Sequence, residues 1–570
     1  MSRHHLSIRA TGGNKDMPKY RVTLDALIKR EDLQVTSSNP DAPGGEVQSI
    51  LIGELEEGRS MFDVVRKPDF QRETSEWTPE QIVELVKNVL DDELIPSVIV
   101  WKAPNRNVFV IDGAHRLSAI MAWINNDYGA GTISIKHFGA IDKIPKAQIE
   151  AHNYTKTLME DKVGAYRDMP KFRKENSGGT QEQILRAKML STAYVSVQSV
   201  RKDAVHAESS FYRINQGGAV INEAEKEIIL RRRRPEALAA RALLRAGTGH
   251  EYWWEFKKET KVEIVELAKS VYDTLYHPEL ADPIRTLDLP MAGGGYSADA
   301  LSVLYEFIHI ANDIPRIRLP RGKNVTVEIL PTDDPQRDMD GSGTIKCLKT
   351  VKKVTDLINS NYSGSFGFHP AVYSYSATGR FQPTAFLAHV QLAMWLREKD
   401  LMFKFTPIRK EFEEFLVSYK YFINQLIPNY GGKTKSLIPV SELFRLIADS
   451  FLNGKSASGV LETVLNDPRF SSRLNVVTNV GESKSPRFSK GTTVAIKLRE
   501  ALESAPRCYI CNARYHYNGT TTDHREKAVR DGGSGSMRAG SSTHPYCNSG
   551  YKEKLITLGR WDDEKQQPKA

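Results

Sequence analysis

The chain ends in a group of cysteine and histidine residues that strongly constrains how this region folds. Cys508 and Cys511 form a C-x-x-C pair, and His544 and Cys547 form an H-x-x-C pair. The sequence has only four cysteines, and the remaining one is Cys347. Disulfide-stabilised domains spread their cysteines through the fold, whereas zinc sites gather them in pairs. Two ligand pairs suit tetrahedral zinc at a closed structural site, so we expect Cys508, Cys511, His544 and Cys547 to bind Zn²⁺.

The overall composition is that of an ordinary soluble globular protein. Hydrophobic residues make up 40% and charged residues 26% of the sequence. A chain of 570 residues is too long to fold around one hydrophobic core. No apolar run reaches the length of about eighteen residues that a membrane span needs, and the N-terminus lacks the apolar segment of a secretory signal. We therefore expect a cytoplasmic protein that does not contact a membrane. The net charge of +9 mildly favours a polyanionic partner.

Local patterns predict a multidomain α+β protein. Residues 1–45 are polar and form an expected flexible lead-in, and residues 472–491 form an expected linker. Between and after these segments we predict an α+β domain at 46–230, a mainly helical middle domain at 231–471 and a small zinc module at 492–570. The zinc module can bury little apolar surface, so the metal would supply part of its folding free energy.

The segment 78–126 predicts a helix, two strands and a second helix. Thr78 and Pro79 stand where a helix N-cap and first turn favour them, and apolar residues follow at helical spacing. Two short apolar runs at 96–102 and 107–112 are typical of strands joined by a turn. Residues 115–126 again show helical spacing.

A D-G-x-H-R string joins the second of these strands to the second helix. It contains Asp112, Gly113, His115 and Arg116. A strand, a glycine turn and a helix N-terminus present free backbone N–H groups to a phosphate, and Arg116 adds a planar donor group. Taken alone, the string favours a tight turn with a solvated aspartate and a structural arginine.

A second candidate site lies between the two zinc-ligand pairs. Asp523 and His524 precede the second pair, and Asn548 follows it directly. An Asp-His pair is common by chance, but this position between two pairs of metal ligands is not. The alternative is a zinc ribbon without catalytic activity. The carboxylate and the carboxamide are oxygen ligands for a hard cation, and an imidazole with a pKa near neutrality can take a proton from water.

This C-terminal arrangement resembles the HNH, or ββα-metal, nuclease family. The resemblance implies that His524 is the general base and that Asp523 and Asn548 hold a catalytic Mg²⁺ or Mn²⁺ ion. It departs from the usual family pattern in that His544 replaces a zinc-binding cysteine, and no asparagine precedes the second ligand pair.

The N-terminal half resembles the ParB/sulfiredoxin-like nucleotidase superfamily, specifically its GmrS-type members. The resemblance rests on the F-Q-R element at 70–72, the I-P pair at 95–96, the D-G-x-H-R loop at 112–116 and the F-x-x-I-N-x-G-G segment at 211–218. It implies binding and hydrolysis of a nucleoside triphosphate. The implied nucleotide-binding residues are Asp112, Gly113, His115, Arg116, Arg72 and Asn215.

The run Arg231–Arg234 continues a helical pattern and allows two interpretations. Such a run usually forms a solvated helix face, and the alternative is a surface that lies on DNA.

Together, the two ends resemble GmrSD-type, modification-dependent restriction enzymes and the related SspE-like antiphage effectors. The resemblance implies a nucleotide-regulated, metal-dependent DNA endonuclease that senses modified or phage DNA. Its partners would be DNA and a nucleoside triphosphate, and a homo-oligomer remains open. Two alternatives are a ParB-like DNA-binding regulator with a non-catalytic zinc module and a nucleotide-independent endonuclease of a mobile element.

Overall fold

A computed structural model describes residues 20–33, 46–71, 77–173, 178–215, 223–279, 289–295, 298–316, 334–430, 435–476, 487–524, 532–562 and 565–569. The chain divides into two compact units. The first comprises Met1–Ile221, Thr248–His250 and Arg321–Ile329. The second comprises Asn222–Gly247, Glu251–Pro320 and Leu330–Ala570.

The described part of the first unit contains a mixed six-stranded sheet in the order β1-β3-β5-β4-β6-β2. Its strands are β1 (Lys29–Glu31), β2 (Ser49–Leu51), β3 (Val65–Pro68), β4 (Val98–Lys102), β5 (Val108–Asp112) and β6 (Tyr194–Val200). The pairs β1–β3, β3–β5 and β4–β6 are parallel, and β4–β5 and β2–β6 are antiparallel. The predicted hairpin of β4 and β5 is confirmed, and it lies at the centre of the sheet.

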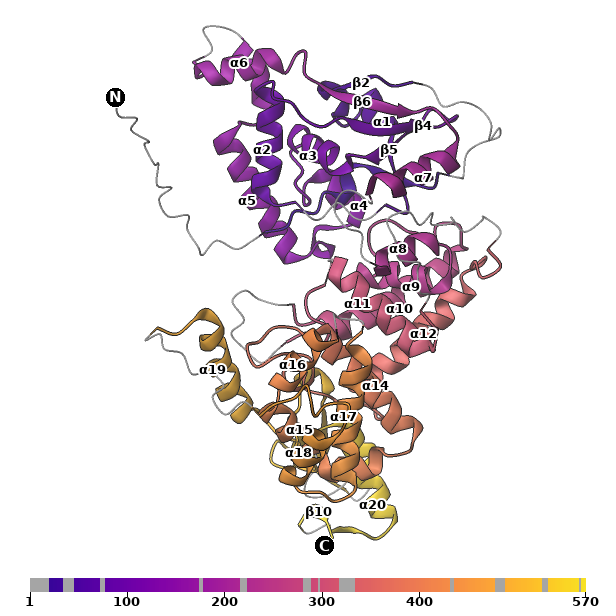
Figure 1. Cartoon of the computed structure of the whole chain (residues 1–570), viewed down its shortest axis with the longest axis vertical. Coiled ribbons are helices and arrows are strands. Elements are labelled where there is room, and N and C mark those ends of the chain that lie inside the picture. The colour runs from indigo at the N-terminus through magenta and orange to yellow at the C-terminus, as the bar shows by residue number, and fades with distance from the viewer. Residues whose placement is uncertain are drawn as a thin grey trace. The chain divides into compact units, whose positions relative to one another are not determined.

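Helices gather beside this sheet, and Figure 1 shows α2, α3 and α5 together on one side of it. The helical elements are η1 (Asp25–Leu27), η2 (Ile52–Leu55), α1 (Ser60–Val64), α2 (Pro79–Leu90), α3 (Ala114–Ile124), α4 (Thr132–Phe138), η3 (Ile141–Lys143), α5 (Lys146–Lys162), η4 (Tyr166–Arg173), α6 (Gln181–Met189) and α7 (Ala204–Asn215). The predicted start of α2 is confirmed, since the Gln81 N–H donates to Thr78 Oγ1 and the Thr78 N–H donates to Gln81 Oε1. The core side of α3 buries Leu117, Ile120 and Met121.

The sheet extends into the segment expected as a lead-in. Within residues 20–33, Leu24 and Ile28 are buried in the core, and β1 pairs with β3. This strand is too short for an alternating apolar pattern to reveal it. Residues 1–19 and 34–45 lie outside the described residues.

The second unit is mainly helical, as predicted for the middle of the chain. Its helices before the C-terminal module are α8 (Glu223–Leu230), α9 (Pro235–Leu244), α10 (Lys258–Tyr276), α11 (Ala298–Asn312), α12 (Ser342–Ile358), α13 (Pro370–Tyr373), α14 (Pro383–Glu398), α15 (Met402–Ser418), α16 (Tyr421–Asn429), α17 (Leu437–Leu452), α18 (Ala457–Asn466) and α19 (Lys490–Glu503). They share one hydrophobic core that runs from Ala224 to Leu502. Residues 477–486 of the expected linker lie outside the described residues.

The arginine run 231–234 forms ion pairs inside this helical unit. Arg231 Nη1 lies 3.4 Å from Glu227 Oε1 and 3.6 Å from Glu236 Oε1. Arg234 Nε lies 2.6 Å from Asp334 Oδ2, and the Arg231 and Arg234 side chains are 7% and 11% exposed. These two arginines therefore neither form a solvated face nor offer a free surface to DNA.

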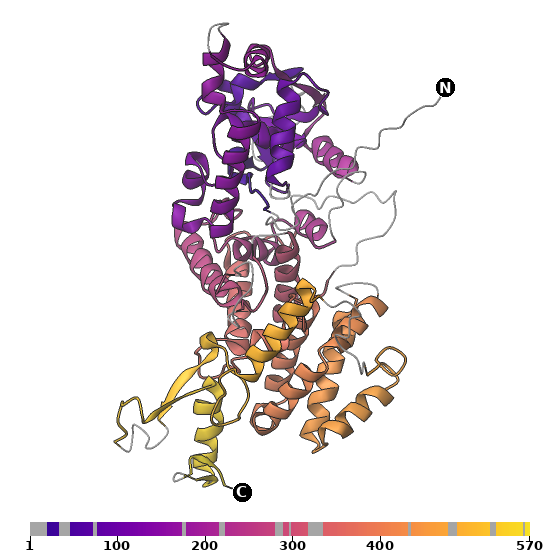
Figure 2. The same cartoon turned by 90° about the vertical axis from the view of Figure 1, so that its left-hand side faces the viewer.

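The C-terminal module follows α19 and consists of short elements. They are η5 (Tyr517–Gly519), β7 (Thr521–His524), β8 (Gly540–Thr543), the π-helix η7 (Cys547–Lys552), α20 (Glu553–Thr557), β9 (Trp561–Asp562) and β10 (Gln567–Pro568). β7 and β8 are antiparallel, with Asp523 opposite Ser541 and His524 opposite Gly540. Figure 2 shows this hairpin in yellow, projecting beside the yellow helix of η7 and α20.

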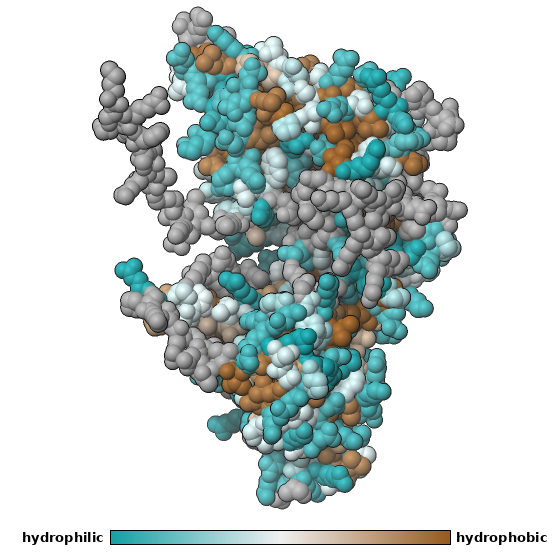
Figure 3. Space-filling view, in the orientation of Figure 1, coloured by the Kyte–Doolittle hydropathy of each residue, from teal (hydrophilic) through white to brown (hydrophobic). Residues whose placement is uncertain are grey.

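The visible surface is mostly hydrophilic, with separate hydrophobic patches (Figure 3). Among the described helices, none is both long enough and apolar enough to cross a membrane.

Two buried histidines make the stability of the helical unit dependent on pH. Burial lowers the pKa of His309 on α11 to about 4 and the pKa of His389 on α14 to about 3. The unfolded chain binds protons on these side chains below about pH 6.5, and the folded chain does not. We therefore expect the contribution of these two histidines to the free energy of unfolding to be complete above about pH 6.5. This contribution should be lost progressively as the pH drops from 6.5 towards 4. Each histidine contributes up to about 1.4 kcal/mol per pH unit.

Denaturant unfolding of the full chain at a series of pH values measures this slope. His389→Gln should reduce the slope of the free energy of unfolding against pH by up to about 1.4 kcal/mol per pH unit, the contribution of one histidine. A slope that stays unchanged in this variant would contradict the assignment.

Candidate functional site

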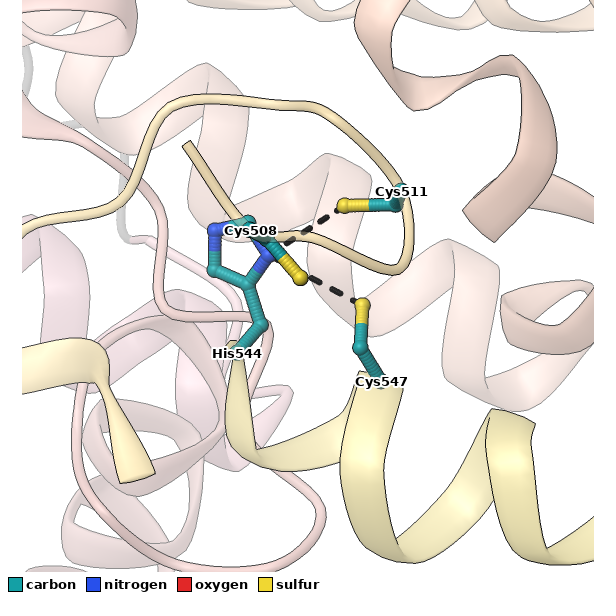
Figure 4. Close-up of side chains that lie close together, drawn as sticks. All are labelled: Cys508, Cys511, His544 and Cys547. Carbon is teal, nitrogen blue, oxygen red and sulfur yellow. Dashed lines mark hydrogen bonds between the residues drawn. The ribbon is translucent and has the colours of Figure 1, made fainter. Parts of the chain in front are cut away.

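The four predicted zinc ligands meet in the C-terminal module. Cys508 and Cys511 come from the loop after α19, His544 follows β8, and Cys547 is the first residue of η7 (Figure 4). Their ligand atoms all lie within 4.8 Å of one another, and all four residues are buried. The ligands of a tetrahedral zinc ion lie about 3.8 Å apart when its Zn–S distance is near 2.3 Å. This Cys₃His donor set therefore fits a zinc ion.

The histidine of this set is oriented by the backbone of Arg514. His544 Nε2 lies 3.0 Å from the Arg514 carbonyl oxygen, and Nδ1 lies 3.3 Å from Cys511 Sγ. A proton on Nε2 that is donated to this carbonyl leaves Nδ1 free to bind the metal. Partners of this kind fix the tautomer and ring orientation of metal-binding histidines.

The backbone of Arg514 is in turn held from the helical region through its N–H. The Arg514 N–H donates to Glu413 Oε2 at 3.1 Å, and Glu413 Oε1 accepts from Arg409 Nε at 2.8 Å and from the Tyr373 hydroxyl at 3.1 Å. Glu413 and Arg409 are almost fully buried on α15. The Cys₃His cluster is thus anchored to the core of α15, and the module and the helices belong to one unit.

Asp523 and His524 occupy the end of β7. Asp523 is 8% exposed, and His524 is partly exposed. The Asp523 carboxylate accepts hydrogen bonds from Lys552 Nζ at 2.8 Å and from the Tyr509 hydroxyl, both at Oδ2. Lys552 Nζ also lies 3.3 Å from the His524 carbonyl oxygen. The end of β7 is therefore tied to the end of η7.

Asn548 is the second residue of η7 and is partly exposed. Its N–H donates to the His544 carbonyl oxygen at 3.2 Å. Lys552 follows Asn548 by four residues on the same helix, and residues at this spacing share a helix face. Because Lys552 contacts Asp523, Asn548 stands on the helix that packs against the end of β7.

Lys552 and Tyr509 were not among the sequence candidates. The helical spacing from Asn548 could have indicated Lys552, and Tyr509 lies inside the C-x-x-C pair. Nothing in the local sequence shows that both side chains meet one carboxylate oxygen.

In the first unit, the D-G-x-H-R string forms the turn from β5 into α3. Gly113 is the N-cap of α3 with φ 92°, a left-handed conformation that favours glycine. A Cβ there would lie 2.9 Å from Arg116 Nη2 and 3.0 Å from Val98 Cγ2. Arg116 Nη2 donates to Asp112 Oδ2 at 2.9 Å and to the Ser97 carbonyl at 3.1 Å.

Arg116 keeps one buried donor without a partner among the described residues, its Nε–H. The His115 ring lies beside Trp77, with ring centroids 6.1 Å apart and planes tilted by 25°. A buried donor with no acceptor suggests an acceptor that a ligand supplies, as a phosphate oxygen would.

Two of the other three elements of the N-terminal pattern pack around the same strand. The Phe70 and Phe211 rings meet edge to face with centroids 5.2 Å apart. Gln71 Nε2 donates to the carbonyls of Val110 and Ile111 on β5 at 3.2 and 3.3 Å. Three segments far apart in the sequence therefore meet at the end of β5 and at α7.

Two predicted nucleotide-binding residues are not placed by these contacts. Arg72 lies outside the described residues. Asn215 ends α7, but its side chain also lies outside the described part of the structure.

One comparison with known proteins found a family that matches part of the chain. A family model described as the GmrSD restriction endonuclease, N-terminal domain, matches residues 51–231. No curated protein and no solved structure was found to match the chain. Residues 51–231 are therefore similar to the N-terminal domain of GmrSD restriction endonucleases, which supports a restriction protein of the GmrSD type.

Proposed function

We propose that this protein is a metal-dependent HNH endonuclease that cuts modified or phage DNA under the control of a nucleotide-binding N-terminal domain. The observation that carries the proposal is the C-terminal module. There, an Asp-His pair ends a strand and packs, through Lys552, against the helix that begins with Cys547 and Asn548. A hairpin and a helix beside a Cys₃His cluster that fits zinc resemble the arrangement of a ββα-metal site.

The donor set suits a hard cation. Asp523 offers a carboxylate oxygen and Asn548 a carboxamide oxygen, which are the ligands that Mg²⁺ and Mn²⁺ prefer. Such an ion, when bound, supplies positive charge to the scissile phosphate and the leaving oxygen. His524 would take the proton from the attacking water, and Asp523 and Asn548 would orient the phosphate through the ion.

The N-terminal domain would bind the triphosphate at the turn from β5 into α3. The helix N-terminus presents backbone N–H groups at Gly113 and beyond, and Arg116 Nε is a buried donor with no partner among the described residues. The GmrSD match over 51–231 covers this turn. Asp112, His115, Arg72 and Asn215 complete the proposed nucleotide site.

Arg116→Ala should weaken nucleotide binding about tenfold to a hundredfold, because it removes a charge-assisted phosphate contact of the kind that arginine makes. Binding of a fluorescent ATP or GTP analogue to the full chain measures the effect. Arg66→Ala is the matched control, since Arg66 lies on β3 and pairs with Glu31 at 2.9 Å. Equal nucleotide affinity in both variants would contradict the placement of the site.

The proposal is tested by incubating the full chain with modified phage DNA and unmodified plasmid DNA. Mg²⁺, Mn²⁺ or EDTA is added, with and without nucleoside triphosphates. We expect cleavage with the divalent ions, none with EDTA, and a change in rate with nucleotide. Intact DNA under every condition would overturn the endonuclease proposal. A cleavage rate that is the same with and without nucleoside triphosphate would overturn only the proposed control by the nucleotide.

One observation favours a second candidate, a DNA-binding regulator with an inert zinc module. The Asp523 carboxylate already has a cationic partner in Lys552, so its burial is satisfied without a catalytic ion. The cleavage experiment separates the two candidates, because the regulator binds DNA without cutting it.

A further inference from the structure

Lys552 is the cation nearest to the proposed catalytic carboxylate among the described contacts. Its Nζ lies 2.8 Å from Asp523 Oδ2, 3.1 Å from the Tyr509 hydroxyl oxygen and 3.3 Å from the His524 carbonyl oxygen. An ammonium group has three N–H donors, so each has an acceptor. Tyr509 in turn donates its hydroxyl proton to the same Asp523 oxygen.

The lysine is held in this place by its surroundings. Its side chain is 7% exposed, and Nζ lies 5.4 Å from the centre of the Trp561 ring and 5.8 Å from that of Tyr509. A cation over aromatic faces gains further electrostatic stabilisation. Lys552 would lose all of these contacts if its side chain moved away from the carboxylate. The lysine therefore stays paired with Asp523.

The hydrogen bonds from Lys552 and Tyr509 fall on one oxygen of the carboxylate. Oδ2 accepts from Lys552 and Tyr509, and Oδ1 has no contact among the described residues. An ion at Oδ1 would therefore meet one carboxylate oxygen and, close behind it, a fixed positive charge. That charge opposes the attraction that an unpaired carboxylate would exert on a divalent cation.

We propose that Lys552 is a positioning residue that keeps the catalytic ion weakly bound until a substrate phosphate adds its negative charge. This inference rests on the proposed nuclease function. Lys552 turns Oδ1 towards the ion and neutralises Asp523, so ion loading depends on DNA. Free protein would carry its structural zinc but little catalytic metal.

The test measures Mn²⁺ binding to zinc-loaded full chain by electron paramagnetic resonance, without DNA. Lys552→Met and Lys552→Gln should bind Mn²⁺ about tenfold more tightly or better than wild type, because they remove the opposing charge. Lys552→Arg should keep wild-type affinity. Lys554→Met is the matched control. It removes a lysine from the adjoining helix whose Nζ lies over Phe403 instead, 4.7 Å from the ring centre.

A second arm adds duplex DNA in the His524→Ala background, which keeps the DNA intact. Mn²⁺ affinity should rise with DNA in this background and rise less when Lys552→Met is added. Zinc content and the melting temperature report folding, and the glutamine and arginine variants keep the test decisive if the methionine variant unfolds.

Unchanged or weaker Mn²⁺ binding in folded Lys552→Met and Lys552→Gln would overturn the inference. The Asp523→Asn variant separates this failure from that of the proposed function. If Asp523→Asn binds Mn²⁺ like wild type, the catalytic metal site itself is misplaced. If Asp523→Asn no longer binds Mn²⁺ and the Lys552 variants bind it with wild-type affinity, only the proposed role of Lys552 is wrong.

Discussion

His524→Ala should reduce metal-dependent DNA cleavage by about a hundredfold to ten-thousandfold, the contribution expected of a general base. The fold should survive, because Lys552 contacts the backbone carbonyl of His524 and not its ring. The β7–β8 pairing also runs through the backbone. The measurement is the initial rate of plasmid cleavage under saturating Mn²⁺, with zinc content as the test of folding.

The matched control for this variant is His206→Ala. His206 lies on α7 of the first unit, where its ring pairs with Asp203, and the variant should cleave like wild type. Cleavage by His524→Ala within about twofold of wild type would be incompatible with a general base at this position.

Cys508→Ser should remove the bound zinc and unfold the C-terminal module. Structural zinc sites contribute about 10–16 kcal/mol of apparent binding free energy, which exceeds what a small loop-rich module gains from its own core. We expect zinc content to fall from one ion per chain to none, and cleavage to be lost with it. Hydrogen exchange should show the Arg514 amide, which donates to Glu413, losing its protection.

Cys347→Ser provides the control for thiol removal. Cys347 is buried on α12 and is not one of the four clustered ligands. This variant should keep the zinc ion and the protection of the Arg514 amide, with a small loss of stability. A Cys508→Ser protein with full zinc content would show that the cluster is not the metal site.

Local chemistry explains which parts of the fold and site the sequence predicted. Each of the C-x-x-C and H-x-x-C pairs supplies two metal ligands. The four ligands therefore come together once the intervening β7–β8 hairpin has formed. Thr78 caps α2 through Gln81, a partner three residues away. Interactions of this range can be inferred from neighbouring residues.

Long-range pairing explains what the sequence did not predict. The partner of Arg234 is Asp334, one hundred residues away, so the arginine run resembles an exposed face until its acceptors are known. The same holds for Glu413, which binds the Arg514 amide across 101 residues. Lys552 likewise lies 29 residues from Asp523 in the sequence, and only the fold brings its Nζ within 2.8 Å of the carboxylate. Each of these contacts depends on the tertiary fold, which local periodicity does not encode.

The central claim is that Asp523, His524 and Asn548 surround one hard cation. The most direct measurement is an anomalous difference map, recorded at the manganese edge, from crystals of the full chain grown with Mn²⁺ and DNA. We predict a peak about 2.1 Å from Asp523 Oδ1 and from the Asn548 carboxamide oxygen, with the His524 ring beside it. A map with no manganese between these side chains, or with Asn548 too distant to share the ion, would contradict the account.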